Sequence, residues 1–213
     1  MKLVGPWLSG YTRRVGITLR LLNFEFEHLP YHAYAQKELV RQFSPMGRVP
    51  ALVLDAGEVL IDSNAIVDYL DSLNAQEQRL IPGAGAERKR VMHLLAYACA
   101  CYDKLARYCD ELMLRPREHQ IKEIQSGYEE QLLIGLHVLD TEERSPWFLG
   151  EKISQADVMT VVAYQSASVV IPGSVNATRF PSLAALSDLA MSLPAFNQTL
   201  PTASELAASG IGT

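Results

Sequence analysis

The stretch from Gly47 to Leu70, which reads GRVPALVLDAGEVLIDSNAIVDYL, limits the possible folds of this chain more than any other. It holds two short apolar runs, at 51–54 and 59–61, separated by Asp55-Ala56-Gly57. Glycine tolerates the positive φ angle that tight hairpin turns require, so this pattern predicts two antiparallel strands. Asp62-Ser63 then supplies good N-cap residues, and apolar residues follow at helical spacing, which predicts a helix directly after the second strand.

Two features of this stretch indicate a peptide-like ligand. A proline that opens a strand, as Pro50 does, is often cis, and this isomer turns the N–H and C=O of Val49 outward toward an extended ligand backbone. At the helix N-terminus, unpaired N–H groups attract a carboxylate, while the side chain of Asp62 suits an ammonium. Asp62 and Ser63 therefore fit an α-amino acid head group. The alternative interpretation is a cis-proline turn followed by an ordinary N-cap.

The beginning of the chain contains a second candidate site. A short apolar run at 2–4 stops at Gly5-Pro6, and a helical pattern starts near Tyr11, with Arg13 and Arg14 expected outside its apolar face. Ser9 thus lies at the helix start. Its hydroxyl either caps the helix, which contributes about 1 kcal/mol, or donates a hydrogen bond to a bound thiolate beside the positive end of the helix. A free thiol has a pKa of ~8.5, and such surroundings lower it.

The order of the expected elements defines the fold class. A second strand at 24–31 follows the first helix and is therefore expected to run parallel to the first strand, and a short helix at 37–43 comes before the hairpin. Residues 1–74 thus form an α/β domain, and Pro82, Gly83 and Gly85 mark 75–85 as a linker. Long amphipathic patterns at 87–114 and 118–139 predict an all-helical domain over 86–213. The segment from 204 onward has a weak pattern and is expected to be loosely held.

These motifs, taken together, resemble the glutathione S-transferase superfamily. The family's Ser-type classes commonly read Ser-Pro-aromatic followed by Arg and Val, and Ser9-Gly10-Tyr11 with Arg14-Val15 fits that register, with Gly in place of Pro. The segment 44–70 is similar to the family signature NPxGxVPxL…G…L.ES.AI..YL. The phrase Trp147-Phe148-Leu149-Gly150, followed by Ser154 and Asp157, is similar to its F-L-x-G…S/T-x-A-D. The S-x-x-D spacing also reads as a structural capping box.

The resemblance implies a thioredoxin-like glutathione-binding domain, a helical substrate domain and a homodimer. It implies a glutathione transferase in which Ser9 holds the thiolate, Val49 pairs with the cysteinyl backbone and Asp62 and Ser63 hold the γ-glutamyl end. Arg48 is expected at the glycine carboxylate. Tyr11 competes with Ser9 as the thiolate donor. A second-substrate pocket is expected to be lined by Tyr11, Tyr102, Leu105 and Tyr108. A glutathione-dependent cis-trans isomerase and a non-catalytic binding protein remain open as alternatives.

The composition argues against nucleic-acid-binding, membrane-spanning and metal-binding proteins. The net charge of −5 and the lack of a basic patch argue against nucleic acid as a partner. No apolar run approaches the ~20 residues of a membrane span. The three cysteines, Cys99, Cys101 and Cys109, form no paired framework, which indicates a reducing, cytoplasmic location. The histidines are scattered without metal-ligand spacing, so no metal site is expected, and glutathione is expected as a co-substrate.

Overall fold

The computed structural model describes residues 1–209. The chain forms two compact units, which are described separately below. The first unit contains Met1–Gly83 and, in addition, Ser192–Leu206. The second unit is built around Ala84–Met191. No helix in the part of the chain that the structure describes combines the length and the apolar character needed to cross a membrane.

The first unit is built on a mixed sheet of four short strands, β1 (Lys2–Val4), β2 (Glu27–Leu29), β3 (Ala51–Val53) and β4 (Val59–Ile61). Their order is β2-β1-β3-β4, with β2 parallel to β1 and with antiparallel pairing between β1 and β3 and between β3 and β4. The predicted second strand at 24–31 is reduced to β2. Its partner β1 ends at Val4, because Gly5 follows with a φ of 133° and Pro6 has no N–H to extend the ladder.

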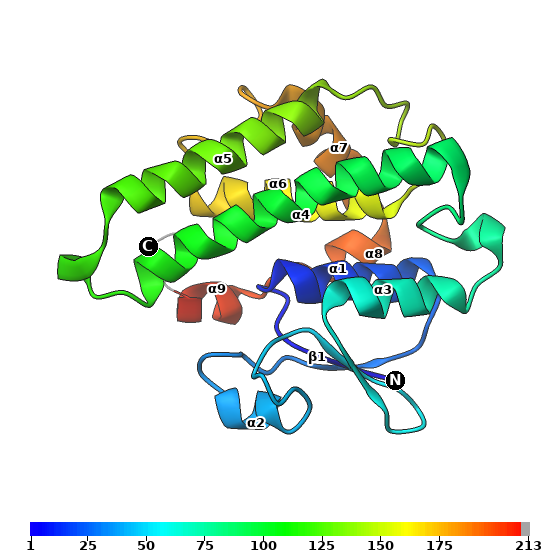
Figure 1. The fold of residues 1–213 in the computed structure, drawn as a ribbon, viewed down its shortest axis with the longest axis horizontal. Helices are drawn as coiled ribbons and strands as arrows, with labels where there is room; N and C mark the ends of the chain where they lie inside the picture. The colour runs from blue at the N-terminus through cyan, green and yellow to red at the C-terminus, as the bar shows by residue number, and fades with distance from the viewer. Residues whose placement is uncertain (210–213) are drawn as a thin grey trace. The chain divides into compact units, whose positions relative to one another are not determined.

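Helices cover both faces of this sheet. The helical segments of the first unit are α1 (Gly10–Leu21), α2 (Lys37–Arg41), α3 (Ser63–Ser72), the 3-10 turn η1 (Gln76–Gln78), α8 (Pro194–Asn197) and the start of α9 (Ala203–Ser209). Helices α1 and α3 lie side by side on one side of the sheet, and α2 lies on the other (Figure 1). The core between sheet and helices contains Leu3, Ile17, Leu52 and Ile66, all with no exposed surface.

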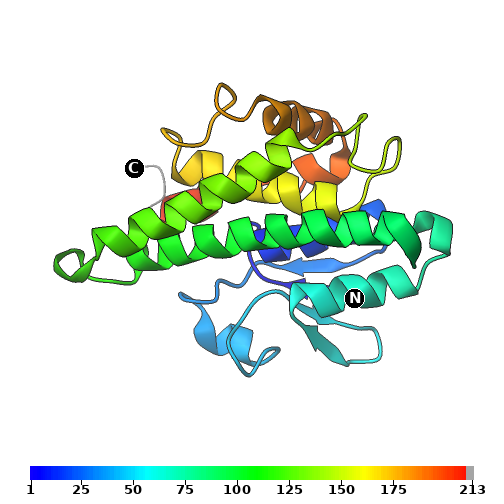
Figure 2. The same cartoon turned by 45° about the horizontal axis from the view of Figure 1, so that its top comes forward.

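The second unit is all-helical among the residues described. It contains α4 (Gly85–Met113), the 3-10 turn η2 (Arg117–His119), α5 (Lys122–Thr141), α6 (Gln155–Val170) and α7 (Pro181–Met191). Figure 2 shows α4 and α5 running alongside each other. They approach closely at Gly135, where an added Cβ would lie 2.4 Å from the Sγ of Cys101. A thioredoxin-like first part and a helical second part confirm the predicted fold class.

The capping box predicted at Ser154 and Asp157 is present at the start of α6. The Asp157 carboxylate accepts hydrogen bonds from the backbone N–H groups of Phe148 (2.9 Å) and Ser154 (2.8 Å), and from the Ser154 hydroxyl (2.6 Å). Burial raises the pKa of Asp157 above its ordinary value, although these donors oppose that effect. Asp157 is therefore a structural group that joins the Trp147-Phe148 segment to the start of the buried helix.

The segment 192–206 packs with the first unit, although the sequence analysis placed it within a continuous helical domain. Arg20 of α1 donates a hydrogen bond from Nη1 to the Oε1 of Gln198 at 2.7 Å. Residues 203–209 form α9, so the weak pattern of the tail does not prevent regular structure there. Residues 210–213, the remainder of the tail that was expected to be loosely held, lie outside the described residues.

Candidate functional site

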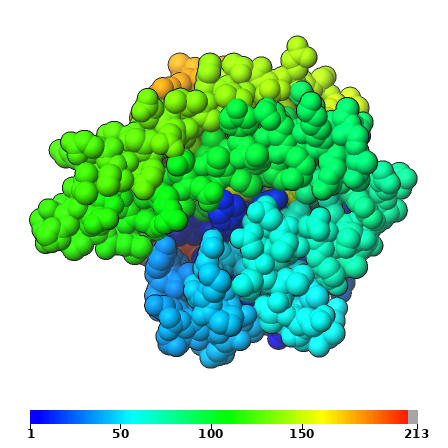
Figure 3. All heavy atoms as spheres, viewed as in Figure 1, coloured from blue at the N-terminus to red at the C-terminus, as the bar shows by residue number. Residues whose placement is uncertain are grey.

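The strand register brings three predicted site segments to one edge of the sheet. Val4, the last residue of β1, pairs with Ala51, the first residue of β3, and Ala51 also pairs with Ile61, the last residue of β4. The loop that carries Ser9 therefore starts beside Val49-Pro50 and beside Asp62-Ser63. In Figure 3 the dark-blue N-terminal segment is visible at the surface between the light-blue segment around α2 and the cyan segment around α3.

Ser9 is the N-cap of α1. It has extended backbone angles, and its Oγ accepts a hydrogen bond from the backbone N–H of Thr12 at 3.4 Å. This distance is long compared with the usual ~2.9–3.0 Å of an N–H···O bond. A hydroxyl accepts and donates at the same time, and the Ser9 O–H donates to no group among residues 1–209. The capping and thiolate-binding interpretations of Ser9 are therefore compatible.

The peptide bond between Val49 and Pro50 is cis, as the sequence analysis predicts. Among the described residues, neither the N–H nor the C=O of Val49 takes part in a backbone hydrogen bond. Gly5 packs against this segment with a φ of +133°, and an added Cβ there would lie 2.9 Å from the Cβ of Val49 and 2.3 Å from the Oγ1 of Thr12. Glycine at position 5 thus allows the loop of Ser9 and the start of β3 to approach each other closely.

Asp62 and Ser63 form the N-terminus of α3. Asp62 is the N-cap with a φ of 69°, and its carboxylate accepts a hydrogen bond from the N–H of Asn64 at 3.0 Å. The N–H groups of Ser63 and Ala65 have no acceptor within residues 1–209. The Asp62 side chain is exposed, while Ser63 is only 3% exposed. This helix end therefore offers backbone N–H donors to an anion and a carboxylate to a cation.

Arg14 is a site residue that the sequence analysis placed wrongly. It is only 1% exposed and is the largest of the fully buried side chains, and Arg13 is buried as well, although both were expected outside the apolar face of α1. Arg14 Nη1 donates to Ser63 Oγ at 3.2 Å and to Asn64 Oδ1 at 2.7 Å. It therefore joins α1, which Ser9 caps, to the N-terminus of α3. The Ser63 hydroxyl accepts this bond and can still donate to a ligand, as can the backbone N–H of Ser63.

His28 and Trp7 support the loop of Ser9 from within the first unit. The imidazole Nε2 of His28 is 2.8 Å from the carbonyl oxygen of Gly5, and the ring stacks on Trp7 with centroids 3.7 Å apart. Burial lowers the pKa of His28 below its ordinary value. The Trp7 ring also packs against Gly16 of α1, where an added Cβ would lie 2.3 Å from the indole. The stacked rings of His28 and Trp7 therefore hold the loop of Ser9 in place.

The remaining predicted site residues are Arg48 and the four residues of the expected second-substrate pocket. Arg48 is exposed, and its N–H donates to the hydroxyl of Ser44 at 3.3 Å. Tyr11 lies half-buried on α1, while three further residues predicted for the second-substrate pocket lie on α4 of the other unit. These are Tyr102 and Tyr108, both half-buried, and Leu105, which is 2% exposed. Burial raises the pKa of Tyr108, and Glu129 adds to that effect. The assignment of these residues to ligands remains a prediction.

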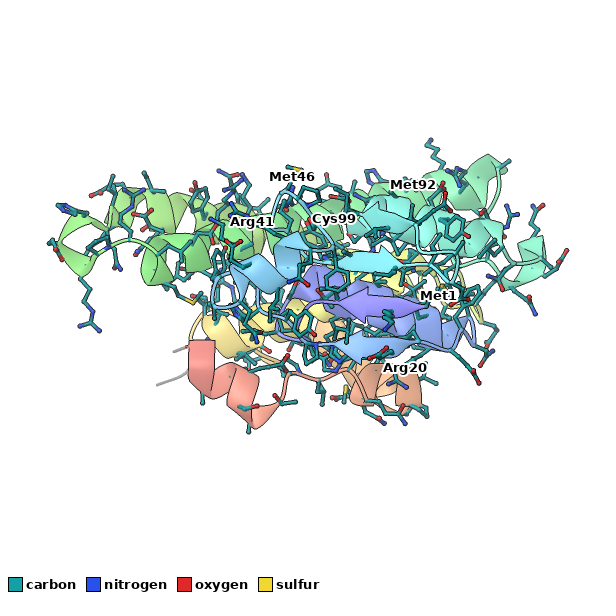
Figure 4. The ribbon with its side chains drawn as sticks, turned by 90° about the horizontal axis from the view of Figure 1, so that it is seen from below. Met1, Arg20, Arg41, Met46, Met92 and Cys99 are labelled. Carbon is teal, nitrogen blue, oxygen red and sulfur yellow. The ribbon has the colours of Figure 1, made fainter. Side chains whose placement is uncertain are left out.

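A cavity within the first unit lies away from this site. It has a volume of ≈ 1050 Å³ and its lining includes Met1, Arg20, Phe24, Phe26, Leu193 and Pro194. In Figure 4 Met1 and Arg20 lie toward one end of the sheet, away from Arg41, the last residue of α2, and from Met46, which follows this helix. Because Met1 precedes β1 and Ser9 follows it, this cavity lies at the opposite edge of the sheet from the candidate site. No group of three or more His, Cys, Asp or Glu side chains suited to a metal ion occurs in the described residues.

The fold and the site define a class of protein: a thioredoxin-like domain with a cis-proline and two helix N-termini at one sheet edge, followed by a helical domain. Residues 3–78 match the family model described as glutathione S-transferase, N-terminal domain. Maleylacetoacetate isomerase of Pseudomonas aeruginosa is 28% identical over 207 residues, which are 94% of this chain and 96% of that protein. These findings support the glutathione S-transferase superfamily: the family model covers residues 3–78, and the similarity to the isomerase spans almost the whole chain.

Two further similarities agree with this assignment. The uncharacterised GST-like protein YibF of Escherichia coli is 37% identical over 106 residues, which cover 48% of this chain and 50% of that protein. The crystal structure of a glutathione S-transferase from Methylobacillus flagellatus KT with GSH bound superimposes with a TM-score of 0.86. It is 25% identical, and the match covers 94% of this chain and 99% of that chain.

Proposed function

We propose that this protein is a glutathione transferase in which Ser9 holds the glutathione thiolate for attack on a small electrophile. The observation that carries this proposal is the common sheet edge shared by the Ser9 loop, Val49 and the start of α3. Two strand spacings separate β1 from β4, which is about 10 Å. An extended tripeptide spans a similar length of about 10 Å. Glutathione therefore matches the edge in length.

The chemistry of each segment fits one part of glutathione. The γ-glutamyl carboxylate suits the backbone N–H groups of Ser63 and Ala65, and its ammonium suits Asp62. The cysteinyl backbone pairs with Val49, and the glycine carboxylate with the exposed guanidinium of Arg48. This register leaves the cysteine sulfur at the Ser9 hydroxyl. The match to the family model and the glutathione-bound relative support this arrangement.

Ser9 favours the anionic form of sulfur without acting as a base. Its hydroxyl donates to the thiolate, and the positive end of α1 adds a favourable potential. The thiol proton is released to solvent. The thiolate then forms a bond from sulfur to the electrophilic carbon, and a leaving group departs or an adduct remains. Each unit by which the thiol pKa falls corresponds to about 1.4 kcal/mol of stabilisation of the anion.

A glutathione-dependent cis-trans isomerase is the second candidate. The similarity over almost the full length to a maleylacetoacetate isomerase favours it. The same thiolate would add to a double bond, rotation would follow about the resulting single bond, and elimination would return glutathione unchanged. Measuring whether glutathione is consumed separates the two reactions, because only conjugation depletes it. A non-catalytic binding protein would bind glutathione without lowering its thiol pKa.

The proposal also includes a cytoplasmic homodimer in which residues 1–74 bind glutathione and residues 86–213 bind the electrophile. Light scattering coupled to gel filtration tests the dimer. Tyr11, Tyr102, Leu105 and Tyr108 are proposed to contact the electrophile. Their substitution is expected to raise the KM for the electrophile more than the KM for glutathione.

The decisive experiment compares Ser9→Ala with Tyr11→Phe. Ultraviolet absorbance of the bound thiolate is followed against pH, and turnover is measured with an aryl halide. Ser9→Ala is expected to raise the thiol pKa by about one unit or more and to lower kcat roughly 10- to 1000-fold while glutathione is still bound. Tyr11→Phe is expected to keep the thiolate. If Tyr11→Phe abolishes the thiolate signal and Ser9→Ala preserves it, the assignment of Ser9 is wrong.

A further inference from the structure

A carboxylate near the end of the described chain contacts the loop that precedes Ser9. The Oε1 of Glu205 accepts a hydrogen bond from the backbone N–H of Trp7 at 2.7 Å, across a sequence separation of 198 residues. Both residues belong to the first unit. The Trp7 side chain is 7% exposed, so the bond is formed beside a buried ring. The contact thus joins α9 to the backbone two residues before Ser9.

Glu205 is itself held in place by the start of α9. Its second oxygen, Oε2, accepts from the N–H of Thr202 at 2.7 Å, and the N–H of Glu205 donates to the Oγ1 of Thr202 at 3.2 Å. This reciprocal pair is a capping box, which fixes the direction of the carboxylate. One oxygen therefore completes the helix end while the other remains directed at Trp7. A carboxylate is required for both bonds, because a glutamine offers only one acceptor oxygen.

We propose that Glu205 is a positioning residue for the thiolate site. The Ser9 N–H donates to the carbonyl oxygen of Pro6 at 3.1 Å, so the residues on both sides of Trp7 form one tight turn. The turn is held at Gly5 by His28, at the Trp7 ring by Gly16 and His28, and at the Trp7 backbone by Glu205. Of these supports, Glu205 contributes a charged acceptor, which makes a stronger hydrogen bond than a neutral one. Its removal shifts the Ser9 hydroxyl and leaves Val49, Asp62 and Ser63 in place.

The effect of Glu205 on the thiolate rests on the proposed function. Its effect on the Trp7 backbone does not. Hydrogen exchange of the Trp7 amide, followed by NMR, needs no activity. Glu205→Ala is expected to accelerate this exchange about ten-fold or more, because a hydrogen bond to a charged group contributes at least a factor of this order. Glu205→Gln is expected to give an intermediate rate. Unchanged exchange in Glu205→Ala would overturn the proposal even if the wild type proved inactive.

The catalytic arm uses the same variants with glutathione and an aryl halide. Glu205→Ala is expected to raise the pKa of the bound thiol and to lower kcat roughly three- to ten-fold, with the glutathione KM changed by less than about two-fold, because misplacement acts on the reacting group. Thr202→Ala is the matched control, since it weakens the helix cap and leaves the Glu205 side chain. It is expected to keep the wild-type thiol pKa.

Equal effects of Thr202→Ala and Glu205→Ala on the thiol pKa and on kcat would assign the role to α9 as a whole and refute positioning by Glu205. If the wild-type protein binds no glutathione, the proposed function is refuted. The hydrogen exchange of the Trp7 amide would then still test whether Glu205 holds the turn.

Discussion

Gly16 offers a direct test of how the loop of Ser9 is held. It lies within α1, where an alanine is ordinarily more favourable than a glycine by about 1 kcal/mol. At this position, however, the new Cβ would lie 2.3 Å and 2.6 Å from two carbon atoms of the Trp7 ring. The ring would have to withdraw by about 1 Å to reach an ordinary contact of 3.4 Å, and His28 stacks on it at 3.7 Å. Overpacking of this kind costs about 1–3 kcal/mol.

Gly16→Ala is therefore expected to lower the free energy of unfolding by up to about 2 kcal/mol, after the gain in helix propensity is subtracted from the overpacking cost. The midpoint of urea unfolding, followed by circular dichroism, is expected to fall by up to about one molar. Gly127→Ala in α5 is the matched control, because no atom lies within 4 Å of the Cβ that it would add. It is expected to raise stability by about 0.5–1 kcal/mol. If both variants are stabilised equally, the Trp7 ring does not restrict position 16 and the reasoning fails.

Three further predictions concern buried groups. Asp157→Asn is expected to cost about 2–3 kcal/mol of unfolding free energy in urea, because an amide cannot accept all the hydrogen bonds that Phe148 and Ser154 donate to the carboxylate; an unchanged midpoint would contradict this. Burial lowers the pKa of His28 below 6.5, so the unfolded chain binds a proton more readily than the folded one, and stability should fall as the pH drops below 6.5. His28→Gln should flatten that part of the stability profile, and a profile as steep as the wild type's would refute the assignment. Burial raises the pKa of Cys101 to about 12, so an aromatic disulfide should label it slowly in native buffer and quickly in denaturant. Rapid native labelling of Cys101 would show that it is not buried.

Local sequence signals predicted much of this site. Proline at the start of a strand, Asp-Ser at a helix start and the S-x-x-D spacing at 154–157 each specify a structure through the residues themselves. The cis bond before Pro50, the N-cap role of Asp62 and the capping box of α6 are all present. The short spacing of these signals explains their success, because each needs only a few neighbouring residues.

The features that the sequence did not reveal depend on distant partners. Arg14 has a polar side chain and was expected outside the apolar face of its helix, yet it is buried, because its partner Ser63, 49 residues away, accepts a hydrogen bond from it. The second strand is short because β1 offers only three residues to pair with it. The contact between Glu205 and Trp7 was missed as well. The T-x-x-E spacing of Thr202 and Glu205 was an available signal for the start of α9, but it does not point to Trp7.

The separation of 198 residues between Trp7 and Glu205 has a consequence for synthesis of the protein. During translation the sheet and its first helices leave the ribosome long before the carboxylate that accepts the Trp7 amide. A nascent chain can therefore assemble the sheet with α1 and α3 early, but the turn that carries Ser9 gains the hydrogen bond from Trp7 to Glu205 only when α9 has been made. A fragment cut after residue 83 would contain strands β1 to β4 and the contacts of His28 and Gly16 with the turn, but it would lack the carboxylate that accepts the Trp7 amide.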